Sequence, residues 1–313
     1  MKKFLIALVI ALPLLVGLFF AAAQFYPEQT AARLIALERA GAQLSPGRTQ
    51  IPGFEIAYLE GGSGEPLVLV HGFGANKDNF IRVAKALTTH YRVIAIDLPG
   101  FGESSAPADV SYDIQSQAER LAQILTALEL PRAHLGGSSM GGWIVAAHGV
   151  LYPERTQSLW LLAPAGSATA KLSEVRQKYV DTGEIELVAR TPEEYQRVLD
   201  VVFAQPPFIP GVVRKVMAEK AASRHEHYAR IFRSLGEDPF YLEPRVQGLQ
   251  IPTLIVWGDQ DRVLDVSAGP ILQALMPQSQ LIVMPGIGHL PMIEAAVPAA
   301  ADYLRFRARI SAP

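Results

Sequence analysis

The chain has 313 residues, of which 50% are hydrophobic and 19% are charged, so it can bury a sizeable core and is not expected to be disordered. Its 28 basic and 30 acidic residues give a net charge of -2, and no basic run indicates a nucleic-acid partner. The absence of cysteine excludes disulfides, thiolate metal sites and cysteine nucleophiles.

The first 23 residues form a separate segment. Lys2 and Lys3 precede an uncharged apolar run over residues 4–23, and at about 1.5 Å per residue this run can cross the hydrocarbon layer of a membrane. It predicts a membrane anchor, although the alanines at 21–23 would also serve as the cleavage site of a signal sequence. In both cases the two lysines are expected to stay in the cytoplasm. The rest of the chain is then periplasmic, either anchored or exported after cleavage.

A helix is predicted over residues 27–42, because Pro27 suits a first helical turn and apolar residues follow at helical spacing. From residue 51 short apolar runs alternate with helical stretches such as 115–128 and 140–151. Strands bounded by helices in this way predict an α/β fold with a mostly parallel sheet that is buried on both faces. The apolar runs lie at residues 66–70, 92–96, 134–136, 159–162, 253–257 and 280–284.

The interval between the runs at 159–162 and 253–257 breaks this rhythm, because it holds helix-like segments at 170–181, 191–203 and 213–236 and no convincing strand. Such an insertion predicts a helical cap over the carboxyl edge of the sheet, where open α/β sheets hold their ligands. The predicted units are an anchor or signal sequence (1–23), a linker helix (24–50), a core (51–166 and 248–313) and a helical cap (167–247).

The strongest catalytic signal is the G-x-S-x-G pattern at residues 137–141, directly after a predicted strand and directly before a predicted helix. Glycines on both sides relieve the crowding around a strained serine backbone, so Ser139 is presented at the tip of the sheet as a nucleophile. Ser138 cannot take this role, because no glycine stands two places after it.

Attack by a serine creates a tetrahedral oxyanion, which needs preorganised hydrogen-bond donors. Met140 begins the predicted helix and offers one backbone N–H. Phe73, in the His-Gly-Phe-Gly loop after the first long apolar run, offers the second. We therefore predict an oxyanion hole formed by these two amides. His71 in the same loop is expected to have a structural role.

The general base is expected on a loop after the last strand, where His289 stands in a glycine-rich sequence. The acid that orients it must come earlier in the chain. Asp261 follows the preceding strand at a distance that lets it reach across to the histidine. Asp259 is interpreted as a turn former and Asp265 as a weaker candidate, and Glu294 follows the histidine and fails the order test.

Other motifs indicate loops rather than chemistry. Residues 97–104 are expected to form a tight turn that shapes the wall of the pocket, and the glycine-rich residues 61–64 are interpreted as a turn. The sequence contains no zinc-protease, P-loop or dinucleotide motif, so no metal or other cofactor is expected.

The motifs taken together resemble the α/β-hydrolase family. HGFG at 71–74, DLPGFGES at 97–104, GSSMGG at 137–142 and GIGH at 286–289 occur in order within about residues 51–308. The resemblance implies an α/β-hydrolase fold whose helical cap is inserted after the sixth core strand. It also implies that Asp261 is the acid of the catalytic triad.

One branch of this family is particularly similar, that of the membrane-anchored monoacylglycerol lipases and related bacterial lipases and esterases. The similar segments are residues 71–78, 191–194 and 257–266, together with the apolar segment that precedes the domain. The resemblance therefore implies a lipid-ester substrate and attachment to a membrane.

We expect a serine carboxylic-ester hydrolase that acts through an acyl-enzyme on monoacylglycerol-like esters. A general short-chain carboxylesterase and a serine-dependent carbon–carbon bond hydrolase remain alternatives, because the same scaffold supports several chemistries. A non-catalytic binding protein is disfavoured, because all three triad residues are present. The substrate is expected to contact apolar residues, which otherwise pack the cap onto the sheet: Phe73, Trp143, Phe203, Phe208, Ile209, Val212 and Val213.

Overall fold

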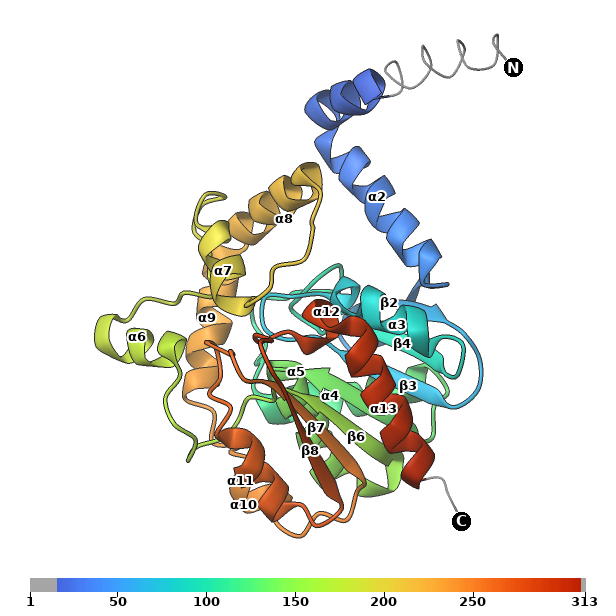
Figure 1. Cartoon of the computed structure of the whole chain (residues 1–313), viewed down its shortest axis with the longest axis vertical. Helices are drawn as coiled ribbons and strands as arrows, with labels where there is room; N and C mark the ends of the chain where they lie inside the picture. The colour runs from blue at the N-terminus through green and yellow to red at the C-terminus, as the bar shows by residue number, and fades with distance from the viewer. Residues whose placement is uncertain (1–15, 311–313) are drawn as a thin grey trace.

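The structure, a computed structural model, describes residues 16–310 and is built around an eight-stranded sheet in the order β1-β2-β4-β3-β5-β6-β7-β8 (Figure 1). Strands β3 to β8 run parallel, whereas β2 pairs antiparallel with both β1 and β4. The predicted mostly parallel sheet is thus confirmed. The strands are β1 (Ser45–Ile51), β2 (Phe54–Gly61), β3 (Pro66–Val70), β4 (Arg92–Ile96), β5 (Ala133–Ser138), β6 (Thr156–Leu162), β7 (Thr253–Gly258) and β8 (Ser279–Met284).

Each face of the sheet has its own core. Along β3, Val68 and Val70 belong to one apolar cluster and Leu67 and Leu69 to the other, and all four side chains are fully buried. Successive side chains of a strand point to opposite faces, so one continuous apolar run supplies both cores. Helices that contribute to the first cluster are α4 (Ile114–Ala127), α5 (Met140–Leu151), α9 (His225–Gly236), α10 (Glu243–Val246) and α11 (Ala268–Leu275). Those that contribute to the second are η1 (Lys77–Phe80), α3 (Ile81–Leu87), α12 (Pro291–Glu294) and α13 (Ala296–Ile310).

The chain between β6 and β7 is helical, as the cap prediction requires, and Figure 1 shows α6 to α9 gathered to one side of the sheet. The helix predicted over 213–236 is in fact two helices, because the backbone of Arg224 leaves helical geometry. Around this break Ser223 Oγ and His225 Nδ1 form hydrogen bonds with the backbone carbonyls of Lys220 and Ala222. Side-chain bonds of this kind compete with regular helical hydrogen bonds and are common where a helix ends. These helices are α6 (Glu174–Thr182), α7 (Tyr195–Val202), α8 (Gly211–Ser223) and α9 (His225–Gly236).

The predicted N-terminal helix is present as α2 (Pro27–Gly41) and lies against the cap, where Ala31 shares an apolar cluster with Val213 and Val216 of α8. The sequence placed residues 45–50 in the linker, but the structure places them in β1, at the edge of the sheet. Most of this strand is exposed, so it carries no apolar run by which it could have been identified.

Residues 1–15 lie outside the described residues, and with them most of the predicted anchor or signal sequence. Residues 16–25 are helical, and Leu18, Phe20 and Phe25 in this segment are exposed. Among residues 16–310, no helix combines the length and the apolar character needed to cross a membrane. The anchor stays a prediction.

Candidate active site

Ser139 lies between β5 and α5 in a backbone conformation that side chains rarely adopt, with φ 55° and ψ -121°. The turn is crowded on every side. A Cβ at Gly137 would lie 2.3 Å from the Gly141 carbonyl oxygen, and a Cβ at Gly141 would lie 2.2 Å from the Val70 carbonyl oxygen. Only glycine fits at these two positions, which is the reason for the G-x-S-x-G pattern.

Three backbone hydrogen bonds hold this strained turn. The Ser139 N–H donates to the Leu162 carbonyl at 2.9 Å, and the Ser139 carbonyl accepts from Trp143 at 3.1 Å and Ala165 at 3.0 Å. Strain at a single residue persists only where its surroundings over-determine the conformation. The neighbouring strand β6 and the first turn of α5 thus present the serine hydroxyl at the carboxyl edge of the sheet.

His289 and Asp261 form a buried hydrogen-bonded pair. His289 Nδ1 lies 2.8 Å from Asp261 Oδ2, and their side chains are only 4% and 0% exposed. The other carboxylate oxygen accepts the backbone N–H groups of Val263 and Leu264, and Trp257 Nε1 donates to Oδ2. An ionised carboxylate only accepts, so Nδ1 carries the proton and Nε2 is left free to take one.

The competing acids have other partners. Asp259 Oδ1 accepts the N–H of Gly286 at 2.7 Å, and Asp265 Oδ1 accepts the N–H of Ser267 at 2.9 Å. Both are turn contacts of the kind that aspartate side chains form readily. The geometry therefore supports Asp261 as the acid that orients the histidine.

The His-Gly-Phe-Gly loop packs directly on the serine. A Cβ at Gly72 would lie 3.0 Å from the Cβ of Ser139. Within the described part of the chain, the N–H groups of Phe73 and Met140 donate to no other group of the protein. Met140 is the first residue of α5, where helix N–H groups are left without intrahelical partners. Both N–H groups are therefore available as donors, and their role as an oxyanion hole stays a prediction.

His71 is structural, as the sequence indicated. Its Nδ1 lies 2.7 Å from the Gly72 carbonyl, and its Nε2 accepts the N–H of Leu98 at 3.1 Å. Burial lowers the pKa of His71, so the ring is neutral and both nitrogens are used by loop backbone.

The turn at residues 97–104 is organised by a buried ion pair. Asp97 accepts the Lys77 ammonium at 2.7 Å, the Lys77 backbone N–H at 2.7 Å and the Glu103 N–H at 2.8 Å. Gly102 is required because a Cβ there would lie 2.1 Å from the Asp97 carboxyl carbon. The predicted tight turn is present. No spacing in the sequence could indicate its buried lysine, because the pairing joins two separate loops.

Phe73 is covered by the aromatic side of the cap. Its ring centroid lies 5.8 Å from Tyr228 and 5.5 Å from Phe232, both on α9, and 6.0 Å from Phe101. Tyr228 and Phe232 were not among the residues predicted to bind substrate, although their four-residue spacing places them on one helix face. Trp143 is buried, and its Nε1 donates to the Phe240 carbonyl at 2.6 Å.

The other residues predicted to bind substrate fall in two places. Phe203 is buried at the end of α7, and Phe208 is 84% exposed. Ile209, Val212 and Val213 pack against α2. This contact covers apolar surface on the cap, and the substrate-binding role of all these residues stays a prediction.

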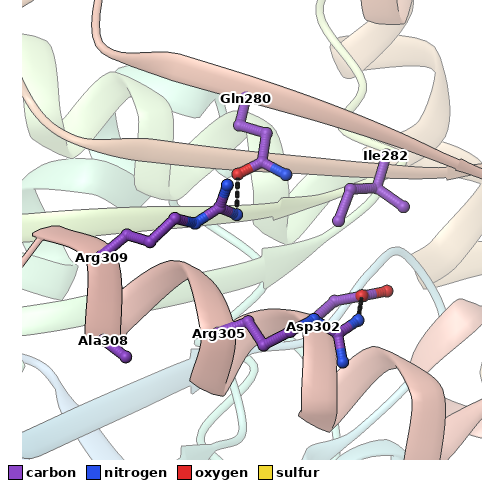
Figure 2. A pocket seen from close by; sticks show the side chains of 6 residues that line it. All are labelled: Gln280, Ile282, Asp302, Arg305, Ala308 and Arg309. Atoms are coloured by element: carbon purple, nitrogen blue, oxygen red, sulfur yellow. Dashed lines mark hydrogen bonds and ion pairs between the residues drawn. The ribbon is translucent and has the colours of Figure 1, made fainter.

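The pocket in Figure 2 lies between β8 and α13 and encloses about 520 Å³. None of the predicted site residues lines it, and its polar side chains bond to one another. In residues 16–310, no cluster of three histidines or carboxylates is placed to hold a metal ion. The residues that line the pocket are Gln280, Ile282, Asp302, Arg305, Ala308 and Arg309.

Known proteins share this architecture. Residues 65–296 match the family described as alpha/beta hydrolase fold. Lipase 1 of Psychrobacter immobilis is 36% identical over 293 residues, which cover 90% of each protein. Monoacylglycerol lipase ABHD6 of Rattus norvegicus is 27% identical over 257 residues, 79% of this chain and 76% of the relative.

A solved structure extends the similarity to the whole chain. The crystal structure of a membrane phospholipase A, described as a novel bacterial virulence factor, is 41% identical, with a TM-score of 0.90 and 100% of each chain covered. The family resemblance and the fold inferred from the sequence motifs are confirmed. The chain therefore belongs to the α/β-hydrolase fold family and is an enzyme of the lipase and esterase type.

Proposed function

We propose that the protein hydrolyses carboxylic esters through an acyl-enzyme formed on Ser139. The hydrogen bond of 2.8 Å between His289 Nδ1 and Asp261 Oδ2 carries this proposal. Ser139, Asp261 and His289 follow β5, β7 and β8, which run parallel and therefore end at the same edge of the sheet. An oriented histidine at that edge is what a weak serine nucleophile needs.

The reaction has two halves. In the first, Ser139 Oγ attacks the ester carbonyl while His289 Nε2 takes its proton, and the Phe73 and Met140 amides bind the oxyanion. The carbon–oxygen bond to the alcohol then breaks, and the histidine returns the proton to the leaving alcohol. In the second, His289 Nε2 takes a proton from a water molecule whose oxygen attacks the acyl carbon. The bond from that carbon to Ser139 Oγ then breaks, His289 returns the proton to Oγ, and the acid and the free serine are released.

Lipid esters such as monoacylglycerols are the proposed substrates. Ser139 is 9% exposed and His289 is 3% exposed, so the substrate must leave water to reach them. The cap presents the aromatic rings of Tyr228 and Phe232 above Phe73, a surface suited to an acyl chain. The names of the relatives, two lipases and a phospholipase, support the same class. Residues 167–247 are accordingly proposed to act as a cap on the core formed by 51–166 and 248–313.

The enzyme is further proposed to be held at a membrane by its N-terminal segment, with the catalytic domain in the periplasm. The exposed Leu18, Phe20 and Phe25 and the described membrane phospholipase support this proposal. Protease added to intact spheroplasts should degrade the domain. Protection of the domain until the cells are lysed would place it on the cytoplasmic side instead.

The direct test is fatty-acid release by the full chain from a long-chain monoacylglycerol, a triacylglycerol and a short-chain nitrophenyl ester. The wild-type protein is expected to release fatty acid fastest from the monoacylglycerol. Ser139→Ala is expected to be inactive, and thermal unfolding should show that this variant is folded. Cleavage of only the short ester would restrict the function to a general carboxylesterase. Equal activity of the two proteins on all three substrates would refute the acyl-enzyme proposal.

A further inference from the structure

The loop that carries His289 is bonded to the cap as well as to the core. The N–H of His289 donates to the carbonyl of Val202, the last residue of α7, at 3.0 Å. Beside this contact, the side-chain amide of Gln205 donates to the Gly286 carbonyl at 3.0 Å. The proposed general base is therefore held partly by the segment in which α7 ends.

One carboxylate joins these two segments. Glu294 Oε2 accepts the backbone N–H of Ala204 at 2.9 Å and that of Gln205 at 2.8 Å. The same carboxylate accepts the N–H of Gly288, at 3.1 Å to Oε1 and 3.2 Å to Oε2. Gly288 immediately precedes His289, so a single side chain ties the cap to the residue next to the base.

The two segments meet without spare room. A Cβ at Gly288 would lie 2.6 Å from the Ala204 nitrogen and 2.9 Å from Glu294 Oε1. Gly288 is buried, whereas Ala204 and Gln205 lie at the surface. Water can replace Glu294 as the hydrogen-bond acceptor of the exposed Ala204 and Gln205 amides. The buried Gly288 amide has no access to water and depends on the carboxylate.

We propose that Glu294 is a positioning residue, which holds His289 in place by clamping its loop to the end of α7. The proposal rests on the proposed role of His289 as the general base. Glu294 acts through backbone and not on the imidazole, whose Nδ1 is bonded to Asp261. A carboxylate suits this role because both of its oxygens only accept hydrogen bonds, and four N–H donors converge on it, the fourth being that of Leu290 at 3.5 Å from Oε1.

Glutamine is the informative replacement, because it keeps the shape of the side chain but turns one acceptor into a donor. In Glu294→Gln the amide group must face at least one of the four N–H donors. The loop should then shift relative to Ser139, and small displacements of a catalytic group cost rate steeply.

Glu243 provides a matched control. Its carboxylate also gathers backbone donors of the cap, since Oε1 accepts the N–H of Ala168 at 2.8 Å and that of Thr169 at 3.1 Å. Ser167 Oγ donates to the same oxygen at 2.5 Å. These contacts hold the start of the cap and do not involve the loop of His289. All of these donors meet Oε1, and Oε2 has no hydrogen-bond partner among the described residues, so Glu243→Gln makes the same replacement in the cap, removes the charge from this contact and does not touch the base.

The experiment measures the labelling rate of Ser139 by a fluorophosphonate probe, together with kcat and KM for a short nitrophenyl ester, in the full chain. Glu294→Gln is expected to lower the labelling rate and kcat by about 10- to 100-fold, with KM changed less than about twofold. Glu243→Gln is expected to lower the melting temperature but to be labelled at the wild-type rate. Gly288→Ala, which pushes the segments apart and keeps both carboxylates, is expected to resemble Glu294→Gln.

The outcomes separate the two proposals. Wild-type labelling in Glu294→Gln, while Ser139→Ala is not labelled, would overturn the positioning role and leave the acyl-enzyme intact. Equal slowing by Glu294→Gln and Glu243→Gln would also overturn it, because general loosening of the cap would then explain both. If Glu294→Gln does not fold, Gly288→Ala decides by the same labelling rate. Failure of the wild-type protein to react with the probe would instead refute the proposed nucleophile.

Discussion

The carboxyl edge of the sheet and the cap above it are held together by different forces. At the edge, backbone and buried side chains dominate, as in the turn at Ser139 and the buried pair of Lys77 and Asp97, whose side chains are 2% and 0% exposed. In the cap, several contacts are ion pairs near solvent, such as Arg190 with Glu194 at 3.6 Å, whose side chains are 64% and 24% exposed. Exposed pairs are screened by salt and contribute little to stability.

This difference assigns the two regions different tasks. The chemistry needs reacting groups that do not move, and the edge supplies them through glycine-dependent turns and buried hydrogen bonds. Substrate entry needs a surface that can shift, and the aromatic contacts and solvent-exposed pairs of the cap suit it to this proposed role. Changes at the edge should therefore affect turnover or stability strongly, and changes in the cap should mainly affect substrate choice.

The largest effect is expected from Asp261→Asn. The replacement cannot hold His289 with Nε2 free, because an amide nitrogen in contact with Nδ1 favours the other tautomer. Turnover of a nitrophenyl ester should fall by about 10⁴-fold. Steady-state kinetics beside a thermal unfolding scan test this, and a folded variant that keeps more than a tenth of the activity would contradict the assigned acid.

The buried ion pair of Lys77 and Asp97 allows the comparison of edge and cap to be tested by measuring stability. Lys77→Met leaves the Asp97 carboxylate buried without its ammonium partner and should reduce the free energy of unfolding by about 3–5 kcal/mol. Arg190→Met in the cap, which removes an ion pair with Glu194 whose side chains are 64% and 24% exposed, is the control and should leave the denaturation midpoint unchanged. Urea unfolding of both variants measures the difference. Similar losses in the two would show that edge and cap do not differ in this way.

The aromatic surface of the cap should affect selectivity. Phe232→Ala removes a ring that lies 5.5 Å from Phe73 and should raise KM for long-chain esters by about 10-fold, the cost of losing one buried apolar contact. KM for a short ester should be nearly unchanged. Leu172→Ala, at a cap side chain that is 53% exposed, serves as the control. An equal effect of Phe232→Ala on both esters would argue against an acyl-binding surface there.

The smallest effect concerns pH. Burial, with the nearby Arg155 charge, lowers the pKa of His148 from 6.5 to about 4, so the folded protein keeps this ring neutral. Below pH 6.5 the unfolded chain takes up a proton that the folded chain does not, and stability falls as the pH decreases towards 4. The slope from this residue should be at most about 1.4 kcal/mol per pH unit. Urea unfolding between pH 7 and pH 4.5 should show a shallower slope in His148→Gln.

The amino-acid sequence alone was enough to predict β3 to β8 of the central sheet and the local turns of the site. Strands at 66–70 and 92–96 were identified because burial on both faces makes their apolar runs continuous. The elbow at Ser139 and the loop of His289 were identified because their glycines stand within a few residues of the catalytic side chain and form a short motif. The motif is visible in the sequence even though the atoms that crowd Gly141 and Gly288, in Val70 and Ala204, are distant along the chain.

Features that depend on contact between distant segments became visible only in the folded protein. The edge strand β1 is mostly exposed and leaves no apolar pattern, and Val213 in the cap packs against α2, far away in the sequence. The burial of Lys77 against Asp97 and the contacts of Glu294 with the cap were equally hidden. In each case the partner is chosen by how the chain folds back on itself, and a lysine or glutamate looks the same in sequence whether it meets water or a partner.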